Sequence, residues 1–372
     1  MSEHRHRYQA RPPWPRHPWL TFANGSCQGC LGSVDVTRLA FIFCHQREAQ
    51  MEATRPPTPK FFLYELRSVS EAAARAAARW AGRGPGEAGP AAAAAMRNAL
   101  NQLALDGTVI ASDAAREGAE FMLEADRVGD PKAEHKLDLA VDPVEGTRFL
   151  ARGMTNAMSV IAVGPKESLF EPGPALYMEK IAAPVAALGK IDIEAPVPDR
   201  LDALAEALDK PIQDLSIYVL ERGRNKKLVK QIRKAGARVS LFAAGDIAGA
   251  LMAALPGTGI DAMMGTGGVP EGILAACAMR ALGAEFLGRF DPQQSQEATA
   301  LQAAGMDKSR WYTRNELVAS HDVQFCATGV TNGSLLDGVQ RLGAYERTQT
   351  MLISGLNNGY EILTAYHRSD PG

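Results

Sequence analysis

The chain has 372 residues with 40 basic and 42 acidic side chains, so its formal net charge at pH 7 is −2. A charge this balanced gives no general attraction to nucleic acid or to an anionic membrane surface. Hydrophobic residues make up 46% of the chain and charged residues 22%, which is typical of a globular protein with length for about two domains or subdomains. We therefore expect neither nucleic acid nor a membrane among its partners.

The sequence also indicates a compartment. It has no continuous apolar run of the roughly 18 residues that a membrane span needs, and the N-terminus lacks the apolar core of a secretory signal. Five cysteines, an odd number, fit a reducing compartment better than a disulfide framework. We expect the protein to lie in the cytoplasm.

Residues 1–50 differ from the rest, because they hold three of the five cysteines and four of the seven histidines. We expect a disordered extension here, with Met51 as a plausible natural start. A zinc site is the alternative, since Cys27 and Cys30 are spaced for tetrahedral coordination and Cys44-His45 follow. The second pair is adjacent, however, so both of its side chains would reach one ion only with strain.

Alanine-rich sequence with arginines at helical intervals predicts two helices between Arg67 and Leu105, separated by a glycine- and proline-rich loop at 82–90. Asp106-Gly107 then predicts a turn, and Thr108–Ala111 a strand.

The segment from Lys136 to Val141 predicts the next strand. Leu137, Leu139 and Val141 alternate with Asp138 and Ala140, which is the pattern of a half-buried strand. The strand is expected to end at Asp142, because Pro143 has no N–H for sheet pairing.

Asp142 and Glu145 follow at the end of this strand, and Gly146-Thr147 come next. The two carboxylates can converge on one hard cation, while the backbone N–H groups of Gly146 and Thr147 can face an anion. An ordinary acidic turn is the simpler alternative for so short a motif.

Later segments alternate between helix and strand. Alternation at this spacing predicts an α/β sheet. The expected helices are 201–208, 226–235, 246–255 and 272–282, and the expected strands are 159–163, 216–220, 238–242 and 262–264.

The hexapeptide Asp142-Pro-Val-Glu-Gly-Thr147, after an alternating strand, resembles the signature of the metal-dependent, lithium-sensitive sugar and inositol phosphatases. Further segments in the same order resemble class II fructose-1,6-bisphosphatase. These are 153–163, 176–180, 220–224, 245–248, 265–272 and 325–331. The resemblance covers roughly residue 64 to the C-terminus.

This resemblance implies a fold and an assembly. We expect an α/β protein, a layered αβαβα sandwich, with an α+β half at 51–188 that carries the hexapeptide and an α/β half at 189–372 that carries Gly267-Gly-Val-Pro-Glu-Gly272. The site would lie in the cleft between the halves. Relatives form homo-oligomers, so we expect one here.

The resemblance also implies ligands for Mg²⁺ or Mn²⁺, ions that prefer oxygen donors. Asp142, Glu145 and Glu271 match metal-binding carboxylates, although Glu271 at a helix start would also suit the helix dipole alone. The segment Glu145–Thr147 and Gly268 match phosphate contacts. Thr147 matches the hydroxyl near the attacking water, so Thr147, Glu145 and Asp142 are the expected catalytic residues.

A bisphosphate needs a second anion site. Arg222 and Arg224, flanking Gly223, can hold the distal phosphate in charge-assisted contacts. Tyr177 can stack on the sugar, and Asp246 after Gly245 can accept from sugar hydroxyls. The alternatives are a core aromatic for Tyr177 and a solvated loop for the arginines.

Two segments depart from the family pattern, which normally carries further carboxylates there. In the first loop Gly89 or a near neighbour stands where an Asp is expected, and Glu87 is the available acid. After the second strand Asp113 falls at the ligand position with a shorter side chain, and Glu117 is the reserve. Glu87 and Asp113 therefore complete the expected metal set.

The expected reaction is metal-dependent hydrolysis of the 1-phosphate of fructose 1,6-bisphosphate to fructose 6-phosphate and phosphate, as in gluconeogenesis or the Calvin cycle. Sedoheptulose 1,7-bisphosphate is a second candidate substrate. The alternative hypothesis is a catalytically weakened paralogue that binds a phosphosugar or partners an active bisphosphatase.

Overall fold

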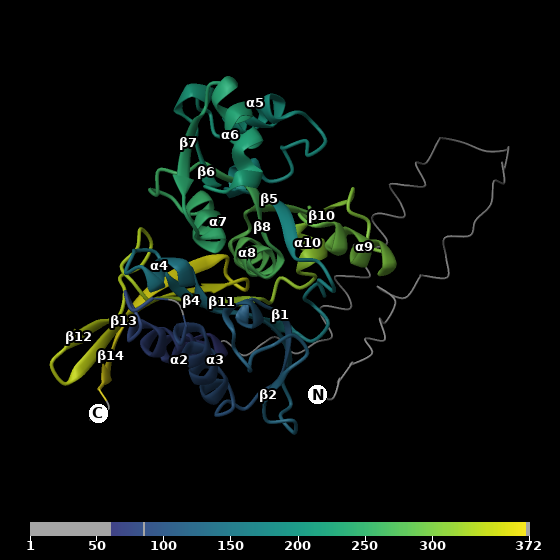
Figure 1. Cartoon of the computed structure of the whole chain (residues 1–372). Helices are drawn as coiled ribbons and strands as arrows, with labels where there is room; N and C mark the ends of the chain where they lie inside the picture. The colour runs from purple at the N-terminus through teal and green to yellow at the C-terminus, as the bar shows by residue number, and fades with distance from the viewer. Residues whose placement is uncertain (1–60, 85, 370–372) are drawn as a thin grey trace, which may run out of the picture. The chain divides into compact units, whose positions relative to one another are not determined.

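The structure is a computed structural model that describes residues 61–84 and 86–369, and these belong to one compact unit. Figure 1 shows its helices and strands. The expected extension at 1–50, the start at Met51 and the zinc alternative lie outside the described residues.

The first sheet has eight strands in the order β12-β13-β11-β4-β3-β1-β2, with β14 paired to β13. The β1–β3 pair is parallel and its other pairs are antiparallel. The strands are β1 (Asp106–Ser112), β2 (Arg127–Gly129), β3 (Lys136–Glu145), β4 (Met158–Pro165), β11 (Gln324–Gly329), β12 (Gln340–Leu342), β13 (Tyr345–Ser354) and β14 (Gly359–Arg368).

The second sheet has six strands in the order β10-β9-β5-β8-β6-β7, and β6 runs parallel to both β7 and β8. These strands are β5 (Tyr177–Ala183), β6 (Ser216–Leu220), β7 (Arg238–Phe242), β8 (Ala262–Gly268), β9 (Glu285–Phe290) and β10 (Trp311–Thr313). The chain thus enters the second sheet at β5 and returns to the first at β11. The boundary expected at residue 189 stays a prediction.

Helices cover both sheets and separate them (Figure 1). The pair α2 (Phe61–Ala78) and α3 (Ala88–Leu100) packs on the outer face of the first sheet. The pair α7 (Asp246–Ala254) and α8 (Val269–Leu282) shares one core with both sheets, and the pair α5 (Val197–Ala207) and α6 (Lys226–Lys234) packs on the outer face of the second. This order of layers confirms the predicted αβαβα sandwich. The shorter helices are α4 (Thr147–Ala151), α9 (Ser295–Ala303) and α10 (Arg314–Leu317).

The sequence pattern explains why α2 lies where it does. Leu66, Val69, Ala73 and Ala77 are fully buried and recur at helical spacing, so they form one apolar stripe against the first sheet. In contrast, α8 is buried on nearly all sides, as expected for a helix between two sheets.

Two expectations about β3 are wrong. The strand does not end at Asp142 but continues to Glu145, because its pairing with β4 shifts register between these two residues and passes over Pro143. It is also buried rather than half-buried. Leu139 faces the α2–α3 core and Ala140 faces the α7–α8 core, so both sides of the strand are covered.

Most other predicted elements are present with small shifts at their ends. The strands at 216–220 and 238–242 have the predicted bounds, whereas the second helix ends at Leu100 rather than Leu105. The turn predicted at Asp106-Gly107 is wrong, because these residues begin β1. The strands β2, β5 and β9–β14 were not predicted. In the described part of the chain, no helix is both long enough and apolar enough to cross a bilayer.

Asp138 lies in the buried strand β3 and is only 3% exposed. Its carboxylate accepts hydrogen bonds from the backbone N–H groups of Ser168 (2.9 Å) and Leu169 (3.2 Å), which fixes the turn after β4. Burial nevertheless raises the pKa of Asp138 to about 6.

This raised pKa predicts a pH-dependent difference in stability. Folded Asp138 binds its proton more tightly than the unfolded chain does between about pH 4 and 6, so its contribution to the unfolding free energy falls as pH rises through that window. Asp138→Asn keeps an acceptor oxygen without the charge. We expect the variant to gain about 1–3 kcal/mol relative to the natural chain between pH 4 and 7, measured by urea unfolding. A difference independent of pH would contradict this.

Candidate active site

The parallel pair β1–β3 brings two of the predicted acidic residues to one edge of the first sheet. Ser112 pairs with Val141, so Asp113 and Asp142 occupy the next positions on neighbouring strands. Asp142 is 1% exposed, and its Oδ1 accepts from the backbone N–H of Val144 at 3.1 Å. That hydrogen bond holds the turn that carries the backbone past Pro143 to Glu145.

Glu145 ends β3 and points into the middle layer. It is 3% exposed, and its Oε1 accepts from the backbone N–H of Ile247 in the first turn of α7 at 2.7 Å. Its Oε2 is buried with no hydrogen-bond partner. One carboxylate oxygen is thus held by a helix N-terminus, and the other is available to a ligand.

Asp246, the first residue of α7, lies beside Glu145 and is 4% exposed. Its Oδ2 accepts from the ammonium Nζ of Lys180 at 2.7 Å, and the same Nζ donates to the carbonyl of Gly268 at 2.9 Å. Lys180 itself is completely buried in β5. A side chain at Gly267 would overlap the Asp246 carboxylate, so the glycine makes room for this ion pair.

Glu271 lies in the first turn of α8. Its carboxylate folds back over Gly268, where a Cβ would overlap it. The two neighbouring glycines, Gly267 and Gly268, thus each leave space for one carboxylate, from α7 and from α8. Acidic side chains in the first turn of a helix also interact favourably with the helix dipole.

These groups form one electrostatic cluster around Glu145. Burial is the main cause that raises the pKa of Glu145 to about 8, and the charges of Asp246 and Glu271 raise it further. The N–H of Ile247 and the charge of Lys180 act in the opposite direction. The cluster therefore joins β3 of one sheet, β5 of the other and the two helices between them.

The chemistry of this cluster suits a hard divalent cation, since its donors are carboxylate oxygens and the buried Oε2 of Glu145 would gain a partner. The geometry is less complete. Over residues 61–84 and 86–369, no group of three or more His, Cys, Asp or Glu side chains is arranged to hold a metal ion. The predicted ligand set of Asp142, Glu145, Glu271, Asp113 and Glu87 therefore stays a prediction.

Glu87 is the predicted ligand that the structure supports least. It is exposed at the start of α3, and its side chain caps nothing there. Its loop does lie near the hexapeptide, because the N–H groups of Gly82 and Gly84 donate to the carbonyls of Leu150 (2.8 Å) and Ala151 (3.0 Å) in α4. The side chain of Glu117 is not described.

Gly146 and Thr147 form the entry to α4. Gly146 has φ of +86°, a conformation that side chains rarely adopt, and it allows the sharp change from β3 into the helix. Thr147 is the first helical residue and is partly exposed. The predicted phosphate contacts of both residues stay predictions.

Basic and aromatic side chains gather beside the acidic cluster. Arg224 lies over the ring of Tyr177 at 4.8 Å, and its Nε donates to the carbonyl of Thr266 at 2.8 Å. Burial lowers the pKa of Arg222, and the nearby charges of Arg148 and Arg224 lower it further. Two further guanidinium groups this close to Arg222 favour a bound anion.

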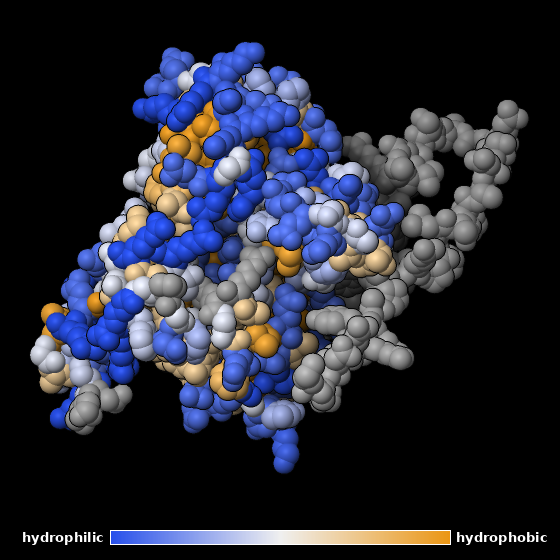
Figure 2. Space-filling view, viewed as in Figure 1, coloured by the Kyte–Doolittle hydropathy of each residue, from blue (hydrophilic) through white to orange (hydrophobic). Residues whose placement is uncertain are grey.

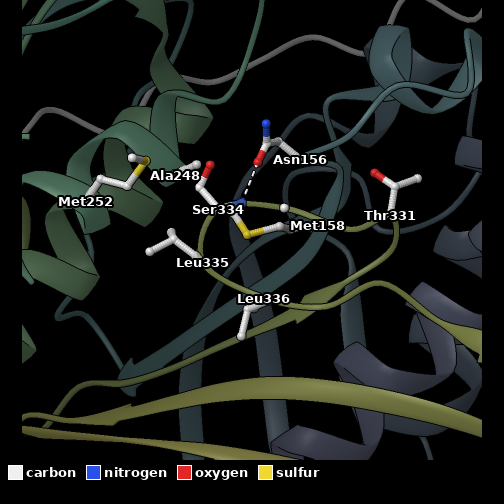
Figure 3. Close-up of a pocket in the computed structure, with 9 residues that line it drawn as sticks. Asn156, Met158, Ala248, Met252, Thr331, Ser334, Leu335 and Leu336 are labelled. Atoms are coloured by element: carbon white, nitrogen blue, oxygen red, sulfur yellow. Dashed lines mark hydrogen bonds between the residues drawn. The ribbon is translucent and has the colours of Figure 1, made fainter. Parts of the chain in front are cut away.

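A separate small pocket lies between α7 and the loop at 331–336 (Figure 3). Figure 3 shows Ala248 and Met252 of α7 on one side and Met158 and Leu336 on the other, with Ser334 N–H donating to Asn156 Oδ1 at 2.8 Å. Its lining includes no carboxylate. We therefore do not assign the phosphate chemistry to this pocket.

Sequence reasoning missed several residues that build the site. Lys180 follows Tyr177 in a segment noted for its family resemblance, and Arg148 directly follows the hexapeptide, so both could have been considered. Glu297 accepts from the N–H of Tyr177 at 2.8 Å. Tyr218 Oη lies 2.7 Å from the carbonyl of Gly245. No sequence signal marks these last two.

The buried pair of Lys180 and Asp246 predicts a strong effect on stability. Lys180→Met leaves the Asp246 carboxylate buried without its ammonium partner, and we expect a loss of about 3 kcal/mol in urea unfolding. Adding Asp246→Asn removes that lone charge, so the double variant should be more stable than Lys180→Met alone. Losses that simply add would show that the two residues are not coupled.

Comparison with known proteins gives consistent matches. A family model described as bacterial fructose-1,6-bisphosphatase, glpX-encoded, matches residues 60–367. A D-fructose 1,6-bisphosphatase class 2/sedoheptulose 1,7-bisphosphatase of Synechococcus sp. (strain JA-2-3B'a(2-13)) is 39% identical over 331 residues, covering 82% of this chain and 95% of the relative. A protein of the same name from strain JA-3-3Ab is 38% identical over 331 residues, with the same coverage of both chains. One from Acaryochloris marina (strain MBIC 11017), whose name ends in 2, is 38% identical over 315 residues, covering 78% of this chain and 90% of the relative.

Proposed function

The chain belongs to the bacterial, glpX-encoded fructose-1,6-bisphosphatase family, and on this premise we propose that it hydrolyses the 1-phosphate of fructose 1,6-bisphosphate. The products are fructose 6-phosphate and phosphate. The relatives' names include sedoheptulose 1,7-bisphosphate, so that sugar is the second substrate we propose.

The observation that supports this proposal most is the juxtaposition of an acidic and a basic group of side chains. The charges of Asp246 and Glu271 raise the pKa of Glu145. Arg224 lies over the ring of Tyr177, and Arg222 is close enough to Arg224 and Asp246 for their charges to act on it. A bisphosphate requires this combination, because the reacting phosphate needs a cation that carboxylates can hold while the distal phosphate needs guanidinium groups.

In the reaction that we propose, a water oxygen attacks the phosphorus of the 1-phosphate, the bond from phosphorus to the sugar oxygen breaks, and that oxygen takes up a proton. Thr147 at the start of α4 orients the water. Asp246 Oδ1, a buried atom with no hydrogen-bond partner in the structure, accepts from a sugar hydroxyl. The hydrogen bond from the Lys180 ammonium holds Asp246 in place.

The ion is Mg²⁺ or Mn²⁺ in our proposal, held by Glu145, Glu271, Asp142 and Asp113. When bound it would acidify the water and neutralise charge on the phosphate. The alternative is the weakened paralogue that binds a phosphosugar or partners an active bisphosphatase. Two observations favour it: Glu87 is exposed, and the described residues include no three-residue metal cluster.

Glu145→Gln tests the catalytic proposal. The amide keeps the acceptor for Ile247 N–H and removes the charge, so folding should survive while phosphate release from fructose 1,6-bisphosphate falls by about 100-fold. The measurement is released phosphate at saturating Mg²⁺ or Mn²⁺, with thermal unfolding as the control for folding. An unchanged rate would remove Glu145 from the mechanism.

The natural chain separates the two hypotheses in the same assay. Phosphate release that stops with a chelator and returns with either ion supports the enzyme. No release with either ion, across fructose and sedoheptulose bisphosphates, would support the weakened paralogue instead.

Arg222→Met tests the distal phosphate site. Loss of one charge-assisted contact should raise KM for fructose 1,6-bisphosphate by about 10–100-fold with little change in kcat, because Arg222 is not expected to touch the reacting phosphate. Fructose 1-phosphate, which lacks the distal phosphate, should be hydrolysed equally by the variant and the natural chain. Lys226→Met, an exposed cation nearby, is the matched control; an equal effect there would point to general charge.

We also propose that the protein acts in the cytoplasm as a homo-oligomer. The two cysteines in the described part of the chain, Cys277 and Cys326, are buried free thiols. That state is consistent with a reducing compartment.

A further inference from the structure

The outer edge of the first sheet is formed by β14. All ten of its residues pair with β13, and no other strand of the described chain pairs with it. A long edge strand is open to pairing with another chain unless charges or prolines block it. The sequence of β14, Gly-Tyr-Glu-Ile-Leu-Thr-Ala-Tyr-His-Arg, contains neither lysine nor proline, and its charged residues are Glu361 and, at its last position, Arg368.

The two faces of β14 differ. On one face Glu361 accepts from Tyr64 Oη of α2 at 3.0 Å, and His367 Nε2 lies 3.5 Å from the Glu71 carboxylate of the same helix. Leu363 packs on the α2–α3 core between them. This face is therefore partly covered by the protein itself.

The opposite face is apolar and open to solvent. Tyr360, Ile362 and Tyr366 are 42%, 45% and 62% exposed. Leu342 and Tyr345 extend the same face across β12 and β13, because Leu342 pairs with Tyr345 and Tyr345 with Arg368. Together they make up five of the twelve large apolar side chains that are exposed in the described chain, and Figure 2 shows apolar surface at this end of the sheet (lower left).

From this edge we propose that a second copy of the chain pairs with β14, antiparallel, around a two-fold axis at Thr364. The two eight-stranded sheets then join into one continuous sheet. The strand that pairs with this edge is thus the β14 of the second copy. The contact is self-complementary, as two-fold symmetry requires.

The register follows from symmetry and side-chain chemistry. In an antiparallel pair, residues directly opposite each other point to the same face of the sheet. A two-fold axis perpendicular to the sheet must therefore pass midway between one residue and the same residue of the second copy. With Thr364 at the axis, Ile362 meets Tyr366 of the second copy and Tyr360 meets its Arg368. On the other face Glu361 meets His367 and Leu363 meets Ala365.

Neighbouring registers match less well. An axis at Leu363 sets Ile362 against Thr364 and Glu361 against Ala365, and an axis at Ala365 sets Ile362 against Arg368 and Leu363 against His367. The Leu363 register also joins apolar partners, because Tyr360 meets Tyr366 and Leu363 meets itself. Of these three registers, only the Thr364 register sets the acidic Glu361 against a basic residue on the other chain.

Charge variants of the exposed face test the proposal on the full chain. The double variant Ile362→Glu/Tyr366→Glu sets carboxylates opposite each other twice in the interface. We expect its dimer dissociation constant, measured by sedimentation, to rise by at least about 100-fold. The matched double variant Ile362→Lys/Tyr366→Glu sets lysine opposite glutamate at both places, so its dimer should be recovered. Circular dichroism and thermal unfolding check that both variants fold.

A thiol at the axis tests the register directly. In Thr364→Cys the two introduced thiols face each other across the strands, so a short bis-methanethiosulfonate reagent should link two chains at low reagent concentration. Tyr366→Cys places the thiols four residues apart along the strands and should link far less.

The outcomes are distinct. A chain that is monomeric at all concentrations, or an oligomer that both charge variants leave intact, would overturn the proposal. Preferential linking of Tyr366→Cys would overturn the register. An intramolecular link from position 364 to Cys27, Cys30 or Cys44 would show that the N-terminal segment, and not a second copy, occupies the edge.

Discussion

The hydrogen bond from the backbone N–H of Ile247 to the Glu145 carboxylate, 2.7 Å long, connects the end of the first sheet to the helix layer that lies between the sheets. It holds a carboxylate at a buried position where burial alone would favour the neutral acid. The other elements of the site are positioned around this contact. Because α7 begins there, Asp246 lies beside Glu145, and the Lys180 ammonium then joins both to the second sheet.

Glycines make this crowding of acidic groups possible. Asp246 and Glu271 each occupy space that a side chain at Gly267 or Gly268 would fill. The two helices that carry them start from adjoining points of the middle layer, and the helix dipoles offset part of the repulsion between the carboxylates. Such a concentration of buried negative charge is costly without a cation, which is the physical reason why a hard metal ion suits the site. The ammonium of Lys180 pairs with Asp246 rather than with Glu145.

The first sheet serves two roles through two of its strands. At β3 it is covered on both faces and delivers Asp142 and Glu145 to the protein interior. At β14 it is uncovered on one face and along its edge, where aromatic side chains are exposed. Burial thus separates the end of the sheet that carries the proposed catalytic residues from the end at which we infer the contact between copies.

Local sequence determined the elements whose signals are local. The strands at 216–220 and 238–242 and the helices after them follow from periodicity, and the layered sandwich followed from resemblance. Tertiary structure decided the rest. The continuation of β3 past Pro143 depends on a register shift against β4, and the complete burial of β3 depends on cores from α2–α3 and α7–α8. Lys180 becomes a partner of Asp246 across 66 positions of sequence, and the exposed position of Glu87 depends on how its loop is fixed to α4. Periodicity reports which side chains of one element share a face, but it cannot report which distant element will cover that face. This is why the sequence suggested candidate site residues without the partners, such as Lys180, that contact them.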